Sequence, residues 1–296
     1  MNINKCDICP HECKVNRKNQ IGRCKATDKV KIALSSLHFF EEPCISGKNG
    51  SGTIFFSNCN LRCVFCQNHK ISHEGYGVEV NVERLAEIMI EQQKNNANNI
   101  NLVSPTIYAY QIKQAIILAK QNGLKIPIIY NSSGYEKVET LKELEGLIDV
   151  YLPDFKYSNN EIALKYSGIK NYYDICLPAI KEMYRQVGTP KLNENGIIEK
   201  GLIIRHLILP NNIENTKRVI DSIKLNFSND IYVSMMAQYF PTYKAKEIPE
   251  INRKISKEEY EEIENYIFEK NIENGYMQDL GKHEEEYVPE FNLSGV

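Results

Sequence analysis

Short apolar runs alternate with amphipathic segments along most of the chain. Six of the runs are rich in β-branched and aromatic residues, which is typical of buried strands. These runs read TIFFS, NINLVSP, IPIIYN, IDVYLPD, GLIIRHLILP and DIYVSMMAQY. The segments between them, such as VERLAEIMIEQQKNN and YAYQIKQAIILAKQNG, have apolar residues at helical spacing. This alternation predicts a parallel sheet covered by helices.

Six strands are fewer than the eight of a closed (β/α)8 barrel, so we expect an α/β fold with a partial (β/α)6 TIM-like barrel. A doubly wound open sheet is the alternative. The expected units are an N-terminal extension over residues 1–48, the partial barrel over 49–245, and a helical segment over 246–296 that packs on the barrel. In either architecture, functional side chains gather at the carboxyl ends of the strands.

Polar side chains end or interrupt these apolar strands. Because the carboxyl ends of parallel strands meet at one edge, these side chains predict a polar pocket. The residues are Ser104, Thr106, Asn131, Ser132, Asp154, Lys156, Arg205 and His206.

The Arg205–His206 pair interrupts the apolar run IIRHLIL. Burying a guanidinium there costs several kcal/mol unless an anion meets it, which favours an anionic ligand or a carboxylate partner. Other residues have simpler explanations: Asp154 and Lys156 as a mutual ion pair, and the Asn131–Ser132 segment as turn chemistry. The acidic pair Glu41–Glu42 before Pro43 could line a site or face water, and for an isolated acidic pair we expect exposure to water.

Composition and charge narrow the functional classes. The chain has 296 residues, a net charge of −2 and nine cysteines. This balance gives no reason to expect nucleic acid or an anionic membrane as a partner. No run approaches the ~20 apolar residues of a membrane span, and the first residues lack a signal core, so we expect a cytoplasmic protein. In a reducing compartment, clustered cysteines bind metal more often than they form disulfides.

Three cysteines, Cys59, Cys63 and Cys66, have the spacing C-x3-C-x2-C directly after the first barrel strand. Structural zinc needs four ligands, so these three would be one short, and catalytic zinc rarely uses three adjacent thiolates. Three thiolates on a [4Fe–4S] cluster leave one iron open to a small chelating molecule. The spacing therefore indicates an open cluster.

Four further cysteines, Cys6, Cys9, Cys13 and Cys24, lie in the N-terminal extension. They would suit a structural zinc ion or a fully ligated [4Fe–4S] cluster, with His11 able to replace one thiol. Free reduced cysteines are the third possibility. Either metal would order a segment too short and polar to fold by burial alone. The sequence leaves the metal open.

The C-x3-C-x2-C loop, with Phe65 before its last cysteine, resembles the signature of the radical S-adenosylmethionine enzymes. Further segments are similar to the PflX-like group, which is related to the activating enzymes of pyruvate formate-lyase. They are GSGTIFFSNCNLRCVFCQN, NINLVSPT, IPIIYNSSGY, VYLPDFKY, IIRHLILP and SMMAQYFP, with CDICPHECKVNR and the EEP-x-ISG segment nearer the N-terminus. The resemblance extends from Cys6 to about Pro241.

This resemblance implies a [4Fe–4S] cluster at Cys59, Cys63 and Cys66 and S-adenosylmethionine as cofactor. In such enzymes the reduced cluster cleaves S-adenosylmethionine to methionine and a 5′-deoxyadenosyl radical, which abstracts hydrogen from a substrate. Here the substrate is unidentified, and a protein or peptide is one candidate. The resemblance also implies anaerobic oxidoreductase chemistry and an electron donor such as flavodoxin or ferredoxin.

Carried over by position, the resemblance places Phe65 near the adenine and Ser104 and Thr106 near the methionyl amine. Relatives have a GGE segment where this chain has Ser104–Thr106. Asn131 and Ser132 would reach the ribose or carboxylate, and Lys156 and Arg205 would suit the carboxylate. The remaining implied cofactor contacts are Asp154 and His206.

Two other functions fit parts of the sequence. One is activation of a glycyl-radical enzyme, although activators with extra clusters insert their cysteines after the radical loop and this chain has them before it. The other is a non-catalytic zinc or iron–sulfur binding protein. An RNA-modifying activity is disfavoured because the chain is acidic overall and lacks a basic patch.

Overall fold

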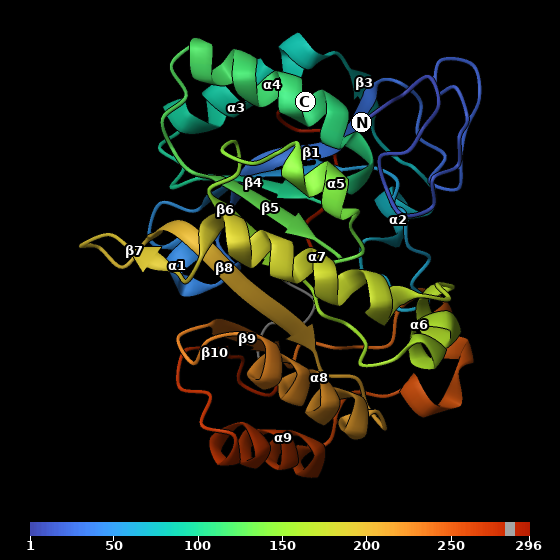
Figure 1. Cartoon of the computed structure of the whole chain (residues 1–296), viewed down its shortest axis with the longest axis vertical. Helices are drawn as coiled ribbons and strands as arrows, with labels where there is room; N and C mark the ends of the chain where they lie inside the picture. The colour runs from blue at the N-terminus through green and yellow to red at the C-terminus, as the bar shows by residue number, and fades with distance from the viewer. Residues whose placement is uncertain (282–287) are drawn as a thin grey trace.

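The computed structural model describes residues 1–281 and 288–296, and its centre is one large sheet (Figure 1). The strand order is β10-β9-β8-β6-β5-β4-β2-β1-β3, and β7 (Lys191–Leu192) pairs with β8. The other strands are β1 (Val30–His38), β2 (Ser51–Phe56), β3 (Val78–Val80), β4 (Ile100–Val103), β5 (Ile128–Ser132), β6 (Val150–Pro153), β8 (Ile198–Leu207), β9 (Tyr232–Met236) and β10 (Gly275–Met277).

The six strands expected from the apolar runs are β2, β4, β5, β6, β8 and β9, and each pairs in parallel with the next. In the described part of the chain, β3 and β10 are the two ends of the strand order and do not pair with each other, so the sheet is open along these two edges. The expected α/β class with a mostly parallel sheet is therefore confirmed.

Helices connect the parallel strands and cover the outer face of the sheet (Figure 1). Two of these helices begin at residues that satisfy free amides of the first turn: Asn81 accepts from the Arg84 amide at the start of α3, and Ser256 and Glu259 form a capping box at the start of α9. The helices are α1 (Pro43–Ser46), α2 (His69–Ser72), α3 (Val82–Lys94), α4 (Ala109–Gln121), α5 (Val138–Lys142), α6 (Asn160–Ser167), α7 (Tyr172–Val187), α8 (Ile213–Asn226) and α9 (Lys257–Glu269).

The two edges of the sheet differ from the expectation. Strand β1 lies in the predicted N-terminal extension, yet it pairs antiparallel with β2 and continues the sheet to β3. Strand β10 lies in the segment expected to be helical, and it pairs in parallel with β9. Helix α9 of that segment does pack on α8, where Tyr266 donates to Asp221 at 2.9 Å. Part of the segment, residues 282–287, lies outside the described residues.

The N-terminal coil, residues 1–29, lies at one side of the molecule and contributes no strand to the sheet (Figure 1). Its contacts to the body include Thr140, which donates to the Ile8 carbonyl at 2.6 Å, and Arg17, which donates to the Ile107 carbonyl at 2.6 Å. In the described parts of the chain, every helix is too short or too polar to cross a bilayer.

Candidate functional site

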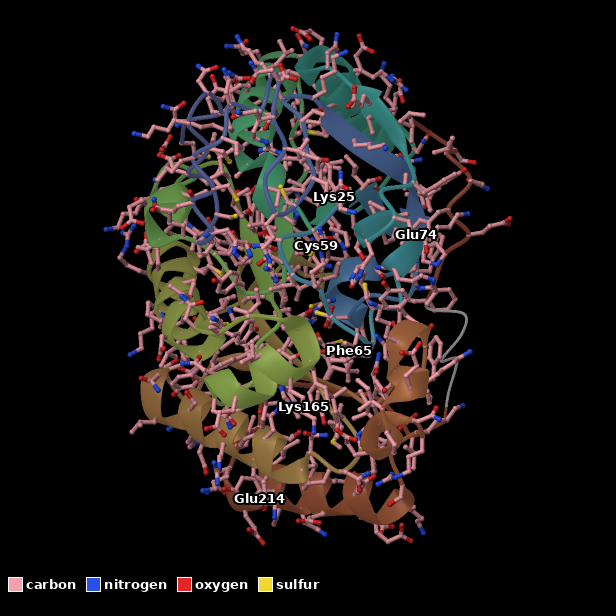
Figure 2. The ribbon with its side chains drawn as sticks, turned by 90° about the vertical axis from the view of Figure 1, so that its right-hand side faces the viewer. Lys25, Cys59, Phe65, Glu74, Lys165 and Glu214 are labelled. Atoms are coloured by element: carbon pink, nitrogen blue, oxygen red, sulfur yellow. The ribbon has the colours of Figure 1, made fainter. Side chains whose placement is uncertain are left out.

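The three-cysteine loop leaves the sheet at the carboxyl end of β2 and is held by backbone hydrogen bonds to distant segments. The amide of Arg62 donates to the Ser167 carbonyl at 3.2 Å, and that of Val64 donates to the Tyr166 carbonyl at 2.8 Å. The Ala245 amide donates to the Val64 carbonyl at 2.9 Å. The loop is therefore fixed between the end of α6 and the chain after β9. Figure 2 places its residues Cys59 and Phe65 in the middle of one face of the molecule.

Each thiol of the loop has a polar neighbour. The Sγ atom of Cys63 lies 2.9 Å from Ser167 Oγ, and that of Cys66 lies 3.1 Å from Ser72 Oγ. The Cys59 sulfur accepts from the Leu61 amide at 3.4 Å. Hydrogen bonds to sulfur of this kind stabilise a thiolate over a thiol.

In the absence of a metal, burial opposes this stabilisation of the thiolates because it favours the neutral thiol. Burial raises the pKa of Cys59 to about 12 and that of Cys66 to about 11. Burial also raises the pKa of Cys63, although Lys156 and Ser167 oppose the rise. The thiols therefore hold their protons at neutral pH, and binding a metal would release them.

Cys59, Cys63 and Cys66 all line one cavity of about 700 Å³, together with residues from the carboxyl ends of the parallel strands. This volume is within the range of small-molecule sites. Seven of the nine predicted cofactor contacts also line it: Phe65, Ser104, Asn131, Ser132, Asp154, Lys156 and Arg205. Thr106 and His206 do not line it.

Arg205 is the centre of an ionic network across the cavity. Its Nε donates to Asp154 at 2.9 Å, its Nη1 to Glu41 at 3.2 Å and its Nη2 to Asn131 at 2.6 Å. Burial lowers the pKa of Arg205, but the neighbouring carboxylates more than offset this and the pKa rises. Arg205 therefore has the carboxylate partner that the sequence favoured. There are two such partners, Asp154 and Glu41, and they come from separate segments of the chain.

Asp154 also joins Lys156 to this network. The Lys156 Nζ donates to Asp154 at 2.6 Å. Burial raises the pKa of Asp154, but Arg205 and Lys156 outweigh it and hold this pKa below its usual value. An ammonium has three donors, and Asp154 takes one of them.

Glu41 and Glu42 line the same cavity, although the sequence suggested that they face water. They follow β1 and are carried into the interior by the turn into α1. Burial raises the pKa of both carboxyls, against the opposing effect of Arg205. The Oε2 atom of Glu42 is buried without a hydrogen-bond partner in the described structure. The only hint in the sequence was an acidic pair immediately before a proline.

Ser104 follows β4 in a backbone conformation that glycine favours, with φ of 60°. Non-glycine residues in this conformation are uncommon and cluster at functional sites.

Thr106 is turned away from the cavity and towards the buried Glu136. Its hydroxyl donates to Glu136 Oε1, and Tyr130 donates to Oε2 at 3.4 Å. Burial raises the pKa of Glu136 to about 8. Thr106 thus connects the turn after β4 to the turn after β5, and the expected cofactor contact of its side chain is not present in this geometry.

His206 is on the opposite face of β8 from Arg205, because side chains alternate along a strand. Its Nδ1 lies 2.6 Å from the Phe155 carbonyl and its Nε2 lies 2.9 Å from Thr216 Oγ1 in α8. The expectation that His206 contacts the cofactor therefore has to be corrected: it is a core histidine between the sheet and α8.

The His206 environment predicts a pH-dependent loss of stability. Burial lowers the pKa of His206 from 6.5 to about 4, so below pH 6.5 only the unfolded chain takes up the proton. Each pH unit below 6.5 then lowers the free energy of unfolding by about 1.4 kcal/mol. Between pH 6.5 and pH 5, the wild type should therefore lose about 2 kcal/mol of stability relative to His206→Gln. Urea unfolding of both proteins at several pH values measures this difference, and a constant difference would contradict the assignment.

The second predicted cysteine group, Cys6, Cys9, Cys13 and Cys24, lies in the N-terminal coil and does not line the cavity. In the described residues of either group, no three His, Cys, Asp or Glu side chains converge as ligands of a single metal ion. A mononuclear zinc site is therefore not preformed in either place.

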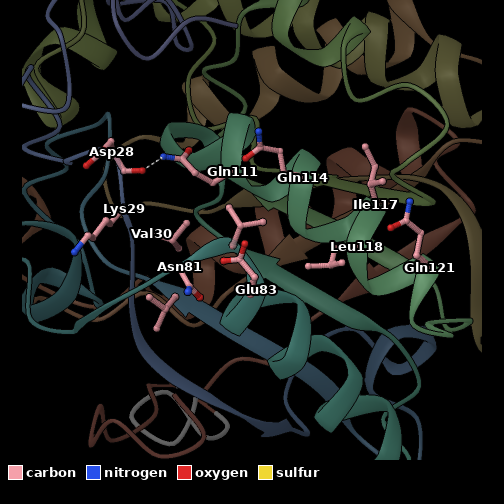
Figure 3. A pocket seen from close by; sticks show the side chains of 12 residues that line it. Asp28, Lys29, Val30, Asn81, Glu83, Gln111, Gln114, Ile117, Leu118 and Gln121 are labelled. Carbon is pink, nitrogen blue, oxygen red and sulfur yellow. Dashed lines mark hydrogen bonds between the residues drawn. The ribbon is translucent and has the colours of Figure 1, made fainter.

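A second cavity of about 590 Å³ lies between α3, α4 and the start of β1 (Figure 3). Gln111 of α4 reaches the Asp28 carbonyl at 2.5 Å there, and the lining contains acidic, amide and aliphatic side chains. None of the described lining residues is a cysteine or histidine. The cysteine cavity is therefore the better candidate for chemistry.

Comparisons with known proteins agree with this choice. The family model described as Radical SAM superfamily matches residues 53–222, which is more than half of the chain. An uncharacterized protein of Methanocaldococcus jannaschii is 36% identical over 269 residues, covering 88% of this chain and 72% of its own. A second uncharacterized protein of that organism is 24% identical over 316 residues. This match covers 96% of this chain and 84% of the relative.

Solved structures with a similar fold include SuiB from Streptococcus suis bound to precursor peptide SuiA, with a TM-score of 0.53 and 15% identity. The match covers 76% of this chain and 48% of SuiB. The hydrogenase maturase HydG from Carboxydothermus hydrogenoformans has a TM-score of 0.52 and 13% identity. This match covers 80% of this chain and 55% of HydG. The chain thus spans about half the length of these structures, and the likeness is one of fold.

Proposed function

Since the chain belongs to the radical SAM superfamily, we propose that it is an enzyme with a [4Fe–4S] cluster at Cys59, Cys63 and Cys66 and S-adenosylmethionine in the adjoining cavity. One observation carries this proposal: the three thiols line the same cavity as a set of buried cationic, acidic and amide side chains. Three thiolates leave one iron of such a cluster open for a chelating ligand.

The residues present fit these two cofactors. Three cysteines on the wall of one cavity suit a cluster, which binds one iron per thiolate and leaves its fourth iron open. A cavity of about 700 Å³ is large enough for a nucleoside-sized molecule. Its lining offers both charge types that a zwitterionic ligand requires, as in Lys156 and Glu42.

When bound together, the cluster and S-adenosylmethionine supply a 5′-deoxyadenosyl radical for hydrogen abstraction. The chain's own residues bind and orient the ligand. Phe65 is buried and packs edge-on to Tyr239 with ring centroids 6.0 Å apart, which suits contact with an adenine ring. Lys156 has two donors beyond its bond to Asp154 for a ligand carboxylate. Arg205 is occupied by three acceptors and instead fixes the cavity wall.

For the substrate, we propose a peptide or protein that reaches the cavity at the opening between the edges of the sheet. Phe39 lines the cavity and is 53% exposed, which would suit contact with an apolar side chain of the substrate. The unpartnered carboxylate oxygen of Glu42 would suit a cationic group. SuiB, a protein of similar fold, has been solved with a precursor peptide.

Three finer assignments complete the proposal. We place the chain in the PflX-like group on the segments quoted above, and in a reducing, anaerobic cytoplasm on its cysteine content. We also propose a small one-electron donor such as flavodoxin or ferredoxin. Glycyl-radical activation is a narrower form of this proposal. In that case the radical would abstract hydrogen from a protein substrate.

The test is an anaerobic assay of the reconstituted protein with dithionite and S-adenosylmethionine. We expect release of 5′-deoxyadenosine and methionine, measured by liquid chromatography. We also expect the three-cysteine site to bind about four irons. The visible absorption of the cluster should rise in proportion to this iron content. A protein that binds the cluster but neither binds nor cleaves S-adenosylmethionine would instead be the non-catalytic binding protein.

A further inference from the structure

Glu136 is a buried carboxyl group in the turn after β5, and the proposed function does not use it. Its side chain is fully buried and does not line the cavity. The hydroxyl of Thr106 donates to its Oε1 atom, and that of Tyr130 donates to its Oε2 atom at 3.4 Å. No cation of the described structure offsets the burial of this group. A carboxyl group that is buried without a cationic partner favours its neutral form.

Through Thr106, Glu136 holds the turn after β4. Thr106 lies two residues beyond Ser104, which lines the cavity and has φ of 60°. The Ser104 amide donates to the carbonyl of Asn131, another cavity residue, at 2.9 Å. A residue in this uncommon backbone conformation keeps it only where its surroundings fix it. The bond between Thr106 and Glu136 is one of the contacts that fix this turn from behind the cavity wall.

Glu136 also belongs to the turn after β5, which contacts both the cavity wall and the three-cysteine loop. The Glu136 amide donates to the Gly134 carbonyl at 2.9 Å. The Gly134 amide donates at 3.2 Å to Oγ of Ser132, which lines the cavity. From the three-cysteine loop, the side chain of Asn60 donates to the Tyr135 carbonyl at 3.0 Å. One buried carboxyl group is therefore bonded to two turns that shape the same cavity.

The turn after β5 is packed closely against the end of β6. Gly134 has φ of 72°, and a Cβ atom at this position would lie 2.7 Å from the Asp154 carbonyl oxygen. The Tyr172 hydroxyl lies 2.8 Å from the Ser133 carbonyl oxygen and 2.7 Å from that of Asp154. A shift of this turn would therefore also move Asp154, whose carboxylate belongs to the ionic network of the cavity.

We propose that Glu136 is a positioning residue for S-adenosylmethionine: its neutral form holds the turns after β4 and β5 in the shape that binds this ligand, and its ionisation weakens binding. The inference rests on the proposed function and adds to it a group that does not touch the ligand. An ionised Glu136 would be a buried charge that only hydroxyl groups meet. Ionisation therefore favours a looser arrangement of the two turns, in which water reaches the carboxylate.

The neighbours of Glu136 allow its ionisation to be observed separately. Burial raises the pKa of Glu136 to about 8. The titratable groups that face it are Tyr130 of β5, Tyr151 of β6 and Cys176 of α7. Burial raises the pKa of all three, that of Cys176 to about 12, so they stay neutral at pH 9. If only neutral Glu136 supports binding, the affinity should be about 10-fold lower at pH 9 than at pH 7.

Binding of S-adenosylmethionine to the anaerobically reconstituted protein tests the proposal. Dissociation constants of the wild type and of Glu136→Gln are measured by equilibrium dialysis from pH 7 to pH 9. Glutamine has the shape of the neutral carboxyl group and does not ionise, so the ratio of the two constants cancels every other titrating group. We expect the wild type to weaken about 10-fold relative to Glu136→Gln over this range. A ratio that does not change with pH would overturn the proposal. Glu139→Gln, at an exposed residue of α5, is the control and should follow the wild type.

Thr106 provides a second pair of variants at constant pH. Thr106→Val removes the hydroxyl that donates to Glu136, whereas Thr106→Ser keeps it. At pH 7 we expect roughly 10-fold weaker binding of S-adenosylmethionine by the valine protein and wild-type binding by the serine protein. Wild-type affinity in the valine protein would show that this bond does not position the turn after β4.

A measurement without ligand separates this proposal from the proposed function. If the wild type binds no S-adenosylmethionine at any pH, the proposed function fails, and amide hydrogen exchange then decides the role of Glu136. Peptides that contain Thr106 or Glu136 should lose protection several-fold between pH 7 and pH 9 in the wild type relative to Glu136→Gln. An unchanged ratio of the two exchange rates would show that the ionisation of Glu136 does not loosen the turns.

Discussion

Replacement of Cys63 by alanine is expected to abolish release of 5′-deoxyadenosine, leaving only the background seen without protein. Cys63 is the most buried of the three loop cysteines, and its sulfur lies between Ser167 and the charge of Lys156. Two thiolates would leave two irons of the proposed cluster unligated by the chain, so the cluster should be lost together with the open coordination site.

Iron content and 5′-deoxyadenosine release are measured on the same preparation. The matched control is Cys44→Ala, which also removes a buried thiol but lies outside the cavity lining. It should keep both the iron and the activity. Wild-type release of 5′-deoxyadenosine from the Cys63→Ala protein would rule out the proposed mechanism, even if its fold were intact.

The sequence was most informative where local pattern decides structure. The six parallel strands followed from short apolar runs separated by amphipathic helices, because both periods are set by backbone geometry. The edge strands β1, β3 and β10 were not predicted as parts of one sheet. They are held by pairing with distant strands, and β3 and β10 are only three residues long.

In the candidate site, too, the residues set by local pattern were predicted and those set by distant contacts were missed. Residues at strand ends, such as Asn131 and Asp154, reach the cavity because parallel strands end at one edge. His206 was misplaced by treating Arg205 and His206 as one pair, whereas adjacent strand residues face opposite sides. Glu41 was missed because its partner Arg205 is 164 residues away, and no local pattern encodes that contact.

Replacement of Arg205 by alanine is expected to destabilise the protein by about 3–5 kcal/mol, the range for removing one member of a buried ion pair. Arg205 is 13% exposed in its side chain and donates to Asp154, Glu41 and Asn131. Without the guanidinium, Lys156 remains as the one cation of this network against three cavity carboxylates. The loss comes mainly from the unpaired charge and only partly from the lost volume.

The pH dependence separates these two causes. Burial already raises the pKa of Glu41 and Glu42, and removing Arg205 takes away the cation that lowers it. The unpaired carboxyls should therefore take up protons as the pH falls, and the Arg205→Ala penalty should shrink between pH 7.5 and pH 5.5. Urea unfolding measures the penalty, with Arg84→Ala as control because both carboxylate partners of Arg84, Glu87 and Glu91, have exposed side chains. A penalty that did not change with pH would show that lost packing, rather than stranded charge, is the cause, and the cavity network would then have no ionic role in stability.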